Sequence, residues 1–178
     1  MSKNVKLAKN PAPKLYRKRM PKPDIFEFFK RLHAIDPEPT SDLEWTNTFT
    51  LLVAVVLSAQ ATDKGVNKAT PALFAIADTP AKMAALGEDK IRGYIKTIGL
   101  FNAKAKNVYE LSKILAEKYD GGVPQTREEL MSLPGVGRKT ANVLLGNAYN
   151  INEGIVVDTH VKRISALMKL TKHTDPIK

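Results

Sequence analysis

Cysteine is absent from all 178 residues, so neither a disulfide framework nor a thiolate metal site can form within this chain. The N-terminus is positively charged but lacks the apolar segment of a secretory signal. The longest apolar run, Leu51 to Leu57, is too short to cross a bilayer. We therefore expect a soluble intracellular protein that does not act on membranes.

Acidic residues are missing from residues 1–22, which contain three prolines and no hydrophobic periodicity. This segment supplies eight of the charges behind the formal net charge of +10. Its basic residues are Lys3, Lys6, Lys9, Lys14, Arg17, Lys18, Arg19 and Lys22. We expect a flexible basic arm that is attracted to a polyanion such as nucleic acid. A merely solvated tail and a targeting tail are the alternatives.

Sustained period-two alternation is also missing, apart from a brief Ile155–Val157, and helical spacing prevails instead. The sequence therefore predicts an all-α fold, a bundle of short helices. The expected helices cover residues 24–35, 45–59, 63–77, 80–86, 88–98, 103–119, 127–133, 138–148 and 159–170. Near-continuous hydrophobicity places the second of these at the centre, although its β-branched residues leave a strand as an alternative. Asp63 is expected to cap the third helix, and residues 99–102 are expected to form a loop.

Residues 133–142 form the stretch where we expect chemistry. Pro134 and Gly135 favour a tight turn, and Gly137 leaves a second main-chain amide without a side chain beside it. Since a helix is predicted to follow directly, these amides would lie at a helix N-terminus, where a phosphate is favoured. The glycine spacing differs from that of a Walker phosphate loop. This difference excludes nucleotide hydrolysis as the function. A glycine turn of purely geometric purpose is the alternative.

Lys139 lies in the first turn of that helix, where a cation opposes the helix dipole. With Arg138 adjacent, this position favours a neutral, nucleophilic amine. An exposed solubilising lysine is the simpler interpretation.

Asp158 follows the apolar Ile155–Val157 run and begins the next predicted helix, so an ordinary N-cap is its simpler interpretation. However, a helix of about 11 residues rises roughly 16 Å, and a return of about nine residues through Gly154 spans up to about 30 Å. The chain can therefore return Asp158 to the Lys139 end, and we expect the two to flank one cleft. An amine, a carboxylate and a phosphate-binding turn together suit attack of the amine on C1′ of a deoxyribose, which forms a Schiff base. β-Elimination of the 3′ phosphate can follow, and no metal is needed.

Several motifs in a fixed order resemble one family. Residues 133–142 with 156–161, together with 57–63, 66–70 and 95–100, closely resemble endonuclease III of the helix-hairpin-helix DNA glycosylase superfamily, across about residues 24–172. The resemblance implies a base-excision-repair DNA glycosylase and abasic-site lyase acting on oxidised pyrimidines in damaged duplex DNA, as a monomer. It further implies location in the cytoplasm of a bacterium, at the nucleoid, or in the nucleus of a eukaryote.

The resemblance also assigns residues. Lys139 corresponds to the Schiff-base nucleophile and Asp158 to the essential aspartate, whereas related adenine glycosylases usually lack the lysine. Gln60 would fill the gap left by the flipped base, and Leu100 would wedge into the stack. The remaining DNA-binding residues would be Leu133, Gly135, Val136, Gly137, Arg138, Thr140 and His160.

One departure concerns a cofactor: the family continues to four cysteines that hold a [4Fe-4S] cluster, and these ligands are absent here. We therefore expect a chain truncated at its C-terminus, and a lineage without the cluster is the alternative. Its expected organisation is an arm (1–22), an N-terminal helix that belongs with the missing region (23–40), a helical bundle (41–158) containing the helix-hairpin-helix (126–150), and the start of a second domain (159–178). The alternative function is a non-catalytic DNA-binding module.

Overall fold

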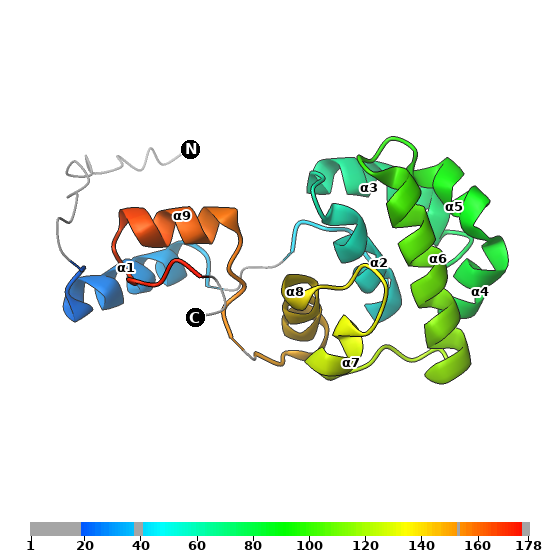
Figure 1. Cartoon of the computed structure of the whole chain (residues 1–178). Coiled ribbons are helices and arrows are strands. Elements are labelled where there is room, and N and C mark those ends of the chain that lie inside the picture. Colours follow the sequence, from blue (N-terminus) through cyan, green and yellow to red (C-terminus); the bar gives the residue numbers. More distant parts are fainter. Residues whose placement is uncertain (1–18, 38–40, 153, 176–178) are drawn as a thin grey trace, which may run out of the picture. The chain divides into compact units, whose positions relative to one another are not determined.

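The computed structural model describes residues 19–37, 41–152 and 154–175 (Figure 1). Their elements are helices: α1 (Lys22–Ile35), α2 (Thr48–Ser58), α3 (Asp63–Phe74), α4 (Pro80–Leu86), α5 (Glu88–Ile95), α6 (Phe101–Lys118), α7 (Arg127–Met131), α8 (Arg138–Tyr149) and α9 (Thr159–Leu167). The predicted all-α class is thus confirmed. Most of the predicted basic arm, residues 1–18, lies outside the described residues.

The chain divides into two compact units, one formed by residues 39–156 and the other by the segments that carry α1 and α9. In the larger unit, α6 packs against both α4 and α5, and α2 packs against α3, α6 and α8 (Figure 1). The two segments of the smaller unit are joined to each other by a hydrogen bond from the Met20 amide to the Lys169 carbonyl oxygen at 3.2 Å. Within the described segments, no helix has the length and apolar character that crossing a membrane requires.

Helix α2 forms the centre of the larger unit. Every residue from Phe49 to Leu57 is buried, which explains why its sequence is apolar on all sides. The strand alternative is therefore wrong. The helix begins three residues later than predicted, because Asn47 forms a capping box: its side chain accepts from the Thr50 amide, and the Thr50 hydroxyl oxygen accepts from the Asn47 amide.

Two local expectations are corrected at the helix ends that surround the site. Thr62, and not Asp63, is the N-cap of α3, since its hydroxyl oxygen accepts from the Gly65 amide. Helix α6 begins at Phe101, inside the predicted loop, because Leu100 alone reverses the chain in a left-handed conformation. Its carbonyl oxygen then accepts the Lys104 amide at 3.1 Å.

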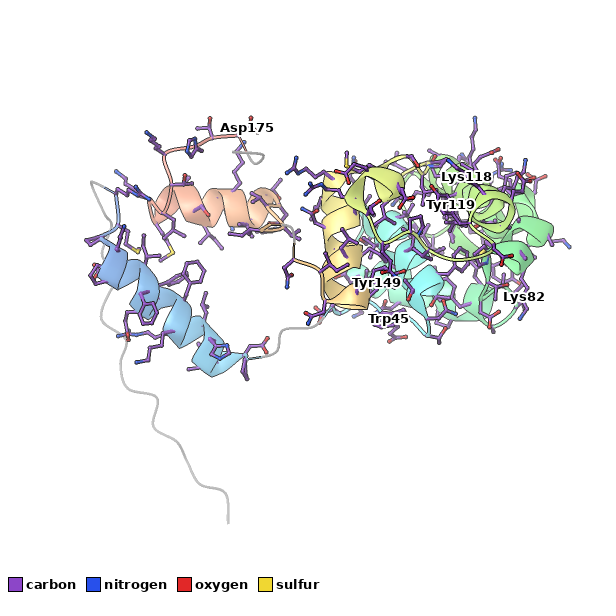
Figure 2. All side chains as sticks on the ribbon, turned by 90° about the horizontal axis from the view of Figure 1, so that it is seen from below. Trp45, Lys82, Lys118, Tyr119, Tyr149 and Asp175 are labelled. Carbon is purple, nitrogen blue, oxygen red and sulfur yellow. The ribbon has the colours of Figure 1, made fainter. Side chains whose placement is uncertain are left out.

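The C-terminal end of α8 is held by a side-chain hydrogen bond. Tyr149, which is labelled in Figure 2, donates its hydroxyl to the Val123 carbonyl oxygen at 2.8 Å. Ala141, Leu144 and Leu145 bury the inner face of the same helix. Helix α8 is thereby anchored in the core through its inner face and its C-terminal end.

Candidate functional site

The turn between α7 and α8 is built on two buried anchors. The side chains of Leu133 and Val136 are 2% and 7% exposed. The Val136 amide donates to the Leu133 carbonyl oxygen at 3.1 Å, which closes the turn. Thr126 caps α7, since its hydroxyl oxygen accepts from the Glu129 amide. Because Leu133 and Val136 face the core, any contact that these residues make with a ligand comes through the main chain.

The two glycines of the turn serve different purposes. Gly135 has φ +78°, and a Cβ added there would lie 2.9 Å from Asn107 Nδ2 on α6. Both its conformation and its packing therefore require glycine. Gly137 has φ −95°, and an added Cβ would meet nothing within 4 Å. Neither the backbone conformation nor the core packing requires glycine at 137. The absence of a side chain there therefore affects only the access of a ligand from solvent to the main chain.

Gly137 is also the N-cap of α8, and it has no side chain that could cap the helix. The first amides of an α-helix have no partner inside the helix, and the dipole makes this end positive. Lys139 and Arg138 are exposed in the first turn. The structure thus has the predicted combination of an uncapped helix N-terminus with two cationic side chains, which suits an anion.

A pocket of about 350 Å³ opens beside this turn within the larger unit. Lys139, Thr140 and Gln60 share its wall, so two separately predicted segments meet there. Within the described part of the chain, the lining residues are Ser41, Leu43, Val55, Ser58, Ala59, Gln60, Asp63, Lys139, Thr140 and Val143. The volume falls within the range typical of small-molecule sites.

Gln60 and Leu100 lie on neighbouring loops and share an unusual backbone. Their φ angles are +54° and +59°, although neither is glycine. The loops approach closely, because a Cβ added at Gly99 would lie 3.8 Å from the Gln60 carbonyl oxygen. The Leu100 side chain is 61% exposed. Left-handed non-glycine residues cost roughly 1–3 kcal/mol each and cluster at functional sites, and an exposed leucine on such a loop suits insertion into a partner.

Asp158 is the N-cap of α9 in the smaller unit. Its Oδ1 accepts from the main-chain amides of His160 at 2.9 Å and Val161 at 2.8 Å. Its Oδ2 lies 3.3 Å from His160 Nδ1, and the imidazole is exposed. The simpler sequence interpretation, a capping carboxylate, is thus correct as local structure. The cap also holds the carboxylate in one orientation.

Sequence reasoning missed two contributors. Asp63 lies on the pocket wall with Lys139, whereas the sequence suggested only a helix cap. Asn107 supports the turn from α6 through its contact at Gly135. The Thr62–Asp63 pair did offer a signal for Asp63, because a threonine immediately before it is itself a good cap.

Comparisons with known proteins place the chain in a family. Residues 53–178 match the family model described as "HhH-GPD superfamily base excision DNA repair protein". The chain is 52% identical over 152 residues to endonuclease III of Treponema pallidum (strain Nichols), covering 85% of this chain and 72% of the relative. Identity to endonuclease III of Escherichia coli (strain K12) is 50% over 145 residues, covering 82% and 68%.

Among solved structures, a non-covalent endonuclease III–DNA complex matches with a TM-score of 0.76 and 44% identity, covering 82% of this chain and 68% of that chain. A trapped endonuclease III–DNA covalent intermediate matches equally well. A thermostable thymine-DNA glycosylase, with a TM-score of 0.70 and 23% identity, shares the fold. The chain therefore belongs to the HhH-GPD superfamily of base excision DNA repair proteins and, within it, to the endonuclease III family.

Proposed function

We propose that this chain excises oxidised pyrimidines from damaged duplex DNA and then cleaves the strand at the abasic site, acting as a monomer through Lys139 and Asp158. The general class, a DNA glycosylase and abasic-site lyase of base excision repair, is that of its family. The observation that carries the residue assignment is the position of Lys139. It is exposed in the first turn after the glycine turn and lies on the wall of a pocket that it shares with Gln60.

In the proposed reaction, the amine of Lys139 attacks C1′ of the damaged nucleotide and the bond from C1′ to the base breaks. The bond from C1′ to the ring oxygen O4′ then breaks and O4′ takes up a proton, which leaves an iminium between C1′ and Lys139. This iminium acidifies the 2′ hydrogens, so the bond from C3′ to the 3′ phosphate can break by elimination. Asp158, held by its two amide hydrogen bonds, stabilises the positive charge that develops on the sugar or assists deprotonation of Lys139.

The surroundings of Lys139 would hold the DNA. Main-chain amides at the start of α8 bind a backbone phosphate, with Arg138 adding charge. Thr140 lies on the pocket wall beside the nucleophile. Gln60 and Leu100, on their adjoining loops, occupy the space of the flipped nucleotide and separate the neighbouring bases. His160, beside Asp158, contacts the same strand.

The [4Fe-4S] cluster implied by the family does not fit the residues present. Such a cluster is held by four cysteine thiolates, and none of the 178 residues is a cysteine. The chain spans about seven tenths of the length of the relatives it matches. No step of the proposed mechanism involves the cluster.

Borohydride trapping on duplex DNA with one abasic site tests the nucleophile. Wild-type protein is expected to give a covalent adduct, and Lys139→Gln is expected to lose it because no amine remains to form the imine. Lys90→Gln, an exposed lysine of α5, is the matched control and should trap normally. An undiminished adduct with Lys139→Gln rules out Lys139 as the nucleophile, whereas tight binding without any wild-type adduct indicates a non-catalytic module.

Asp158→Asn separates chemistry from folding at α9. Asparagine is also a good N-cap, so the helix start should persist. We expect base removal to slow by about 10²–10⁴-fold, the usual range for a lost acid–base group. DNA affinity, measured by fluorescence anisotropy, should change by less than about threefold. Equal losses in rate and affinity would instead show a structural role for Asp158.

A further inference from the structure

The pocket beside α8 contains one carboxylate as well as one amine. Among the lining residues that the structure describes, Asp63 is the only acid and Lys139 the only base, while the others are apolar or uncharged. Asp63 is the first residue of α3, and Lys139 belongs to the first turn of α8. The N-termini of α3 and α8 thus place the Asp63 carboxylate and the Lys139 amine at one pocket.

Asp63 does not cap its own helix. Thr62 caps α3 through the Gly65 amide at 3.2 Å, so the N-cap position is already filled. The Asp63 side chain is exposed at the pocket. Within the described residues, no ion pair holds its carboxylate elsewhere. This carboxylate is therefore available to a molecule in the pocket.

The proposed reaction needs an acceptor for a second proton. After the base has left, the iminium between C1′ and Lys139 still carries both 2′ hydrogens, and elimination begins when one of them is removed. This step belongs to the lyase half of the reaction alone. Asp158 was assigned to the glycosylase half, so the acceptor of the 2′ proton is a separate question.

We propose that Asp63 is the general base that removes the 2′ proton from the Lys139-bound sugar. This proposal rests on the proposed function, because it requires the Lys139 imine. The C2′–H electron pair moves toward the iminium, and the proton passes to the Asp63 carboxylate. The C3′–O bond then breaks, and the 3′ phosphate leaves with its electrons. Water hydrolyses the unsaturated imine, which regenerates the Lys139 amine; no oxidant or reductant is required.

Measuring two products on the same substrate tests this role. Duplex DNA with a preformed abasic site is mixed with excess protein, and borohydride-trapped adduct and strand cleavage are each followed over time. For Asp63→Asn we expect initial adduct formation within about threefold of wild type and strand cleavage slowed by at least about 100-fold. Asp63→Glu, which keeps a carboxylate, should restore part of the cleavage rate.

The matched control is Glu117→Gln, which removes an exposed carboxylate near the far end of α6 and should leave both rates unchanged. Circular dichroism melts verify that each variant folds. Strand cleavage by Asp63→Asn at the wild-type rate overturns the proposal, as does an equal fall in trapping and cleavage. Failure of the proposed function is distinguishable, because the wild-type protein would then give no adduct, or trapping would survive in Lys139→Gln, whatever Asp63 does.

Discussion

Lys104 is a buried cation at the start of α6. Its side chain is 5% exposed, and within the described residues its Nζ has no hydrogen-bond partner. Burial lowers the pKa of the Lys104 amine below its ordinary value of 10.5, because desolvation penalises the ammonium form. Such a residue destabilises the folded state near neutral pH, since the unfolded chain holds the proton more tightly.

Replacing Lys104 by methionine therefore tests the energetic account of the core. The substitution keeps an unbranched chain of similar length and removes a buried donor without a partner. We expect the free energy of unfolding at pH 7, measured by urea titration, to stay level or to increase. A loss of more than about 2 kcal/mol would show that the ammonium has a structural partner.

The pH dependence of the same pair of proteins provides a second check. As pH rises toward 10.5, the unfolded wild-type chain also loses the proton and the penalty disappears. The difference in unfolding free energy between Lys104→Met and wild type should therefore be greatest near neutral pH and shrink as pH increases. If the difference in unfolding free energy instead grew as pH increased from neutral, the burial of the Lys104 ammonium would not explain it.

At the scale of an element, the α7–α8 turn can be tested through its two glycines. Gly137→Ser adds a good N-cap whose hydroxyl competes for the amides at the start of α8. We expect unchanged or raised thermal stability but weaker binding to abasic duplex DNA. Weakened stability with intact binding would contradict the assignment of these amides to a phosphate.

Gly135→Ala is the contrasting substitution in the same turn. A residue with Cβ at φ +78° is strained, and this one would press on Asn107. We expect a loss of at least about 1 kcal/mol in the free energy of unfolding. Retention of full stability in this variant would show that the turn adjusts freely, and the distinction between the two glycines would be lost.

The helices show how far the sequence specifies local structure. Helical spacing predicted α1, α4 and α8 to within about two residues at each end, because each combines an amphipathic or buried face with a strong boundary. Helix α9 ends three residues before its expected end because Lys169 adopts φ +52° and closes a C-terminal turn. Lys169 and Leu100 adopt left-handed conformations, and hydrophobic spacing did not reveal them because it carries no information about the φ angle of a single residue.

In the candidate site, too, local features were predictable from the sequence and the contacts between distant segments were not. The turn at 133–142 and its first-turn lysine were predictable from glycine and proline chemistry in adjacent residues. The meeting of Lys139 with Gln60 and Asp63 in one pocket joins segments about 80 residues apart, and no local pattern specifies it. Functional roles for Gln60 and Leu100 came from the family resemblance, since a loop amide and a loop leucine carry no chemical signature of their own.

For the whole molecule, the high positive charge predicts strongly salt-dependent DNA binding. Residues 1–18 contain six lysines and arginines, and each phosphate that they neutralise contributes about 0.9 to the slope of log affinity against log salt. Deleting residues 1–18 keeps the buried Met20 and should lower that slope by up to about 5. An unchanged slope would show that the arm does not grip DNA.

Peptide mapping of the trapped complex tests the central claim most directly. Wild-type protein is reduced with borohydride on abasic duplex DNA, digested, and analysed by mass spectrometry for the peptide that carries the sugar remnant. The account predicts a single modified residue, Lys139. Modification of another lysine, or of the N-terminal amine, would contradict it.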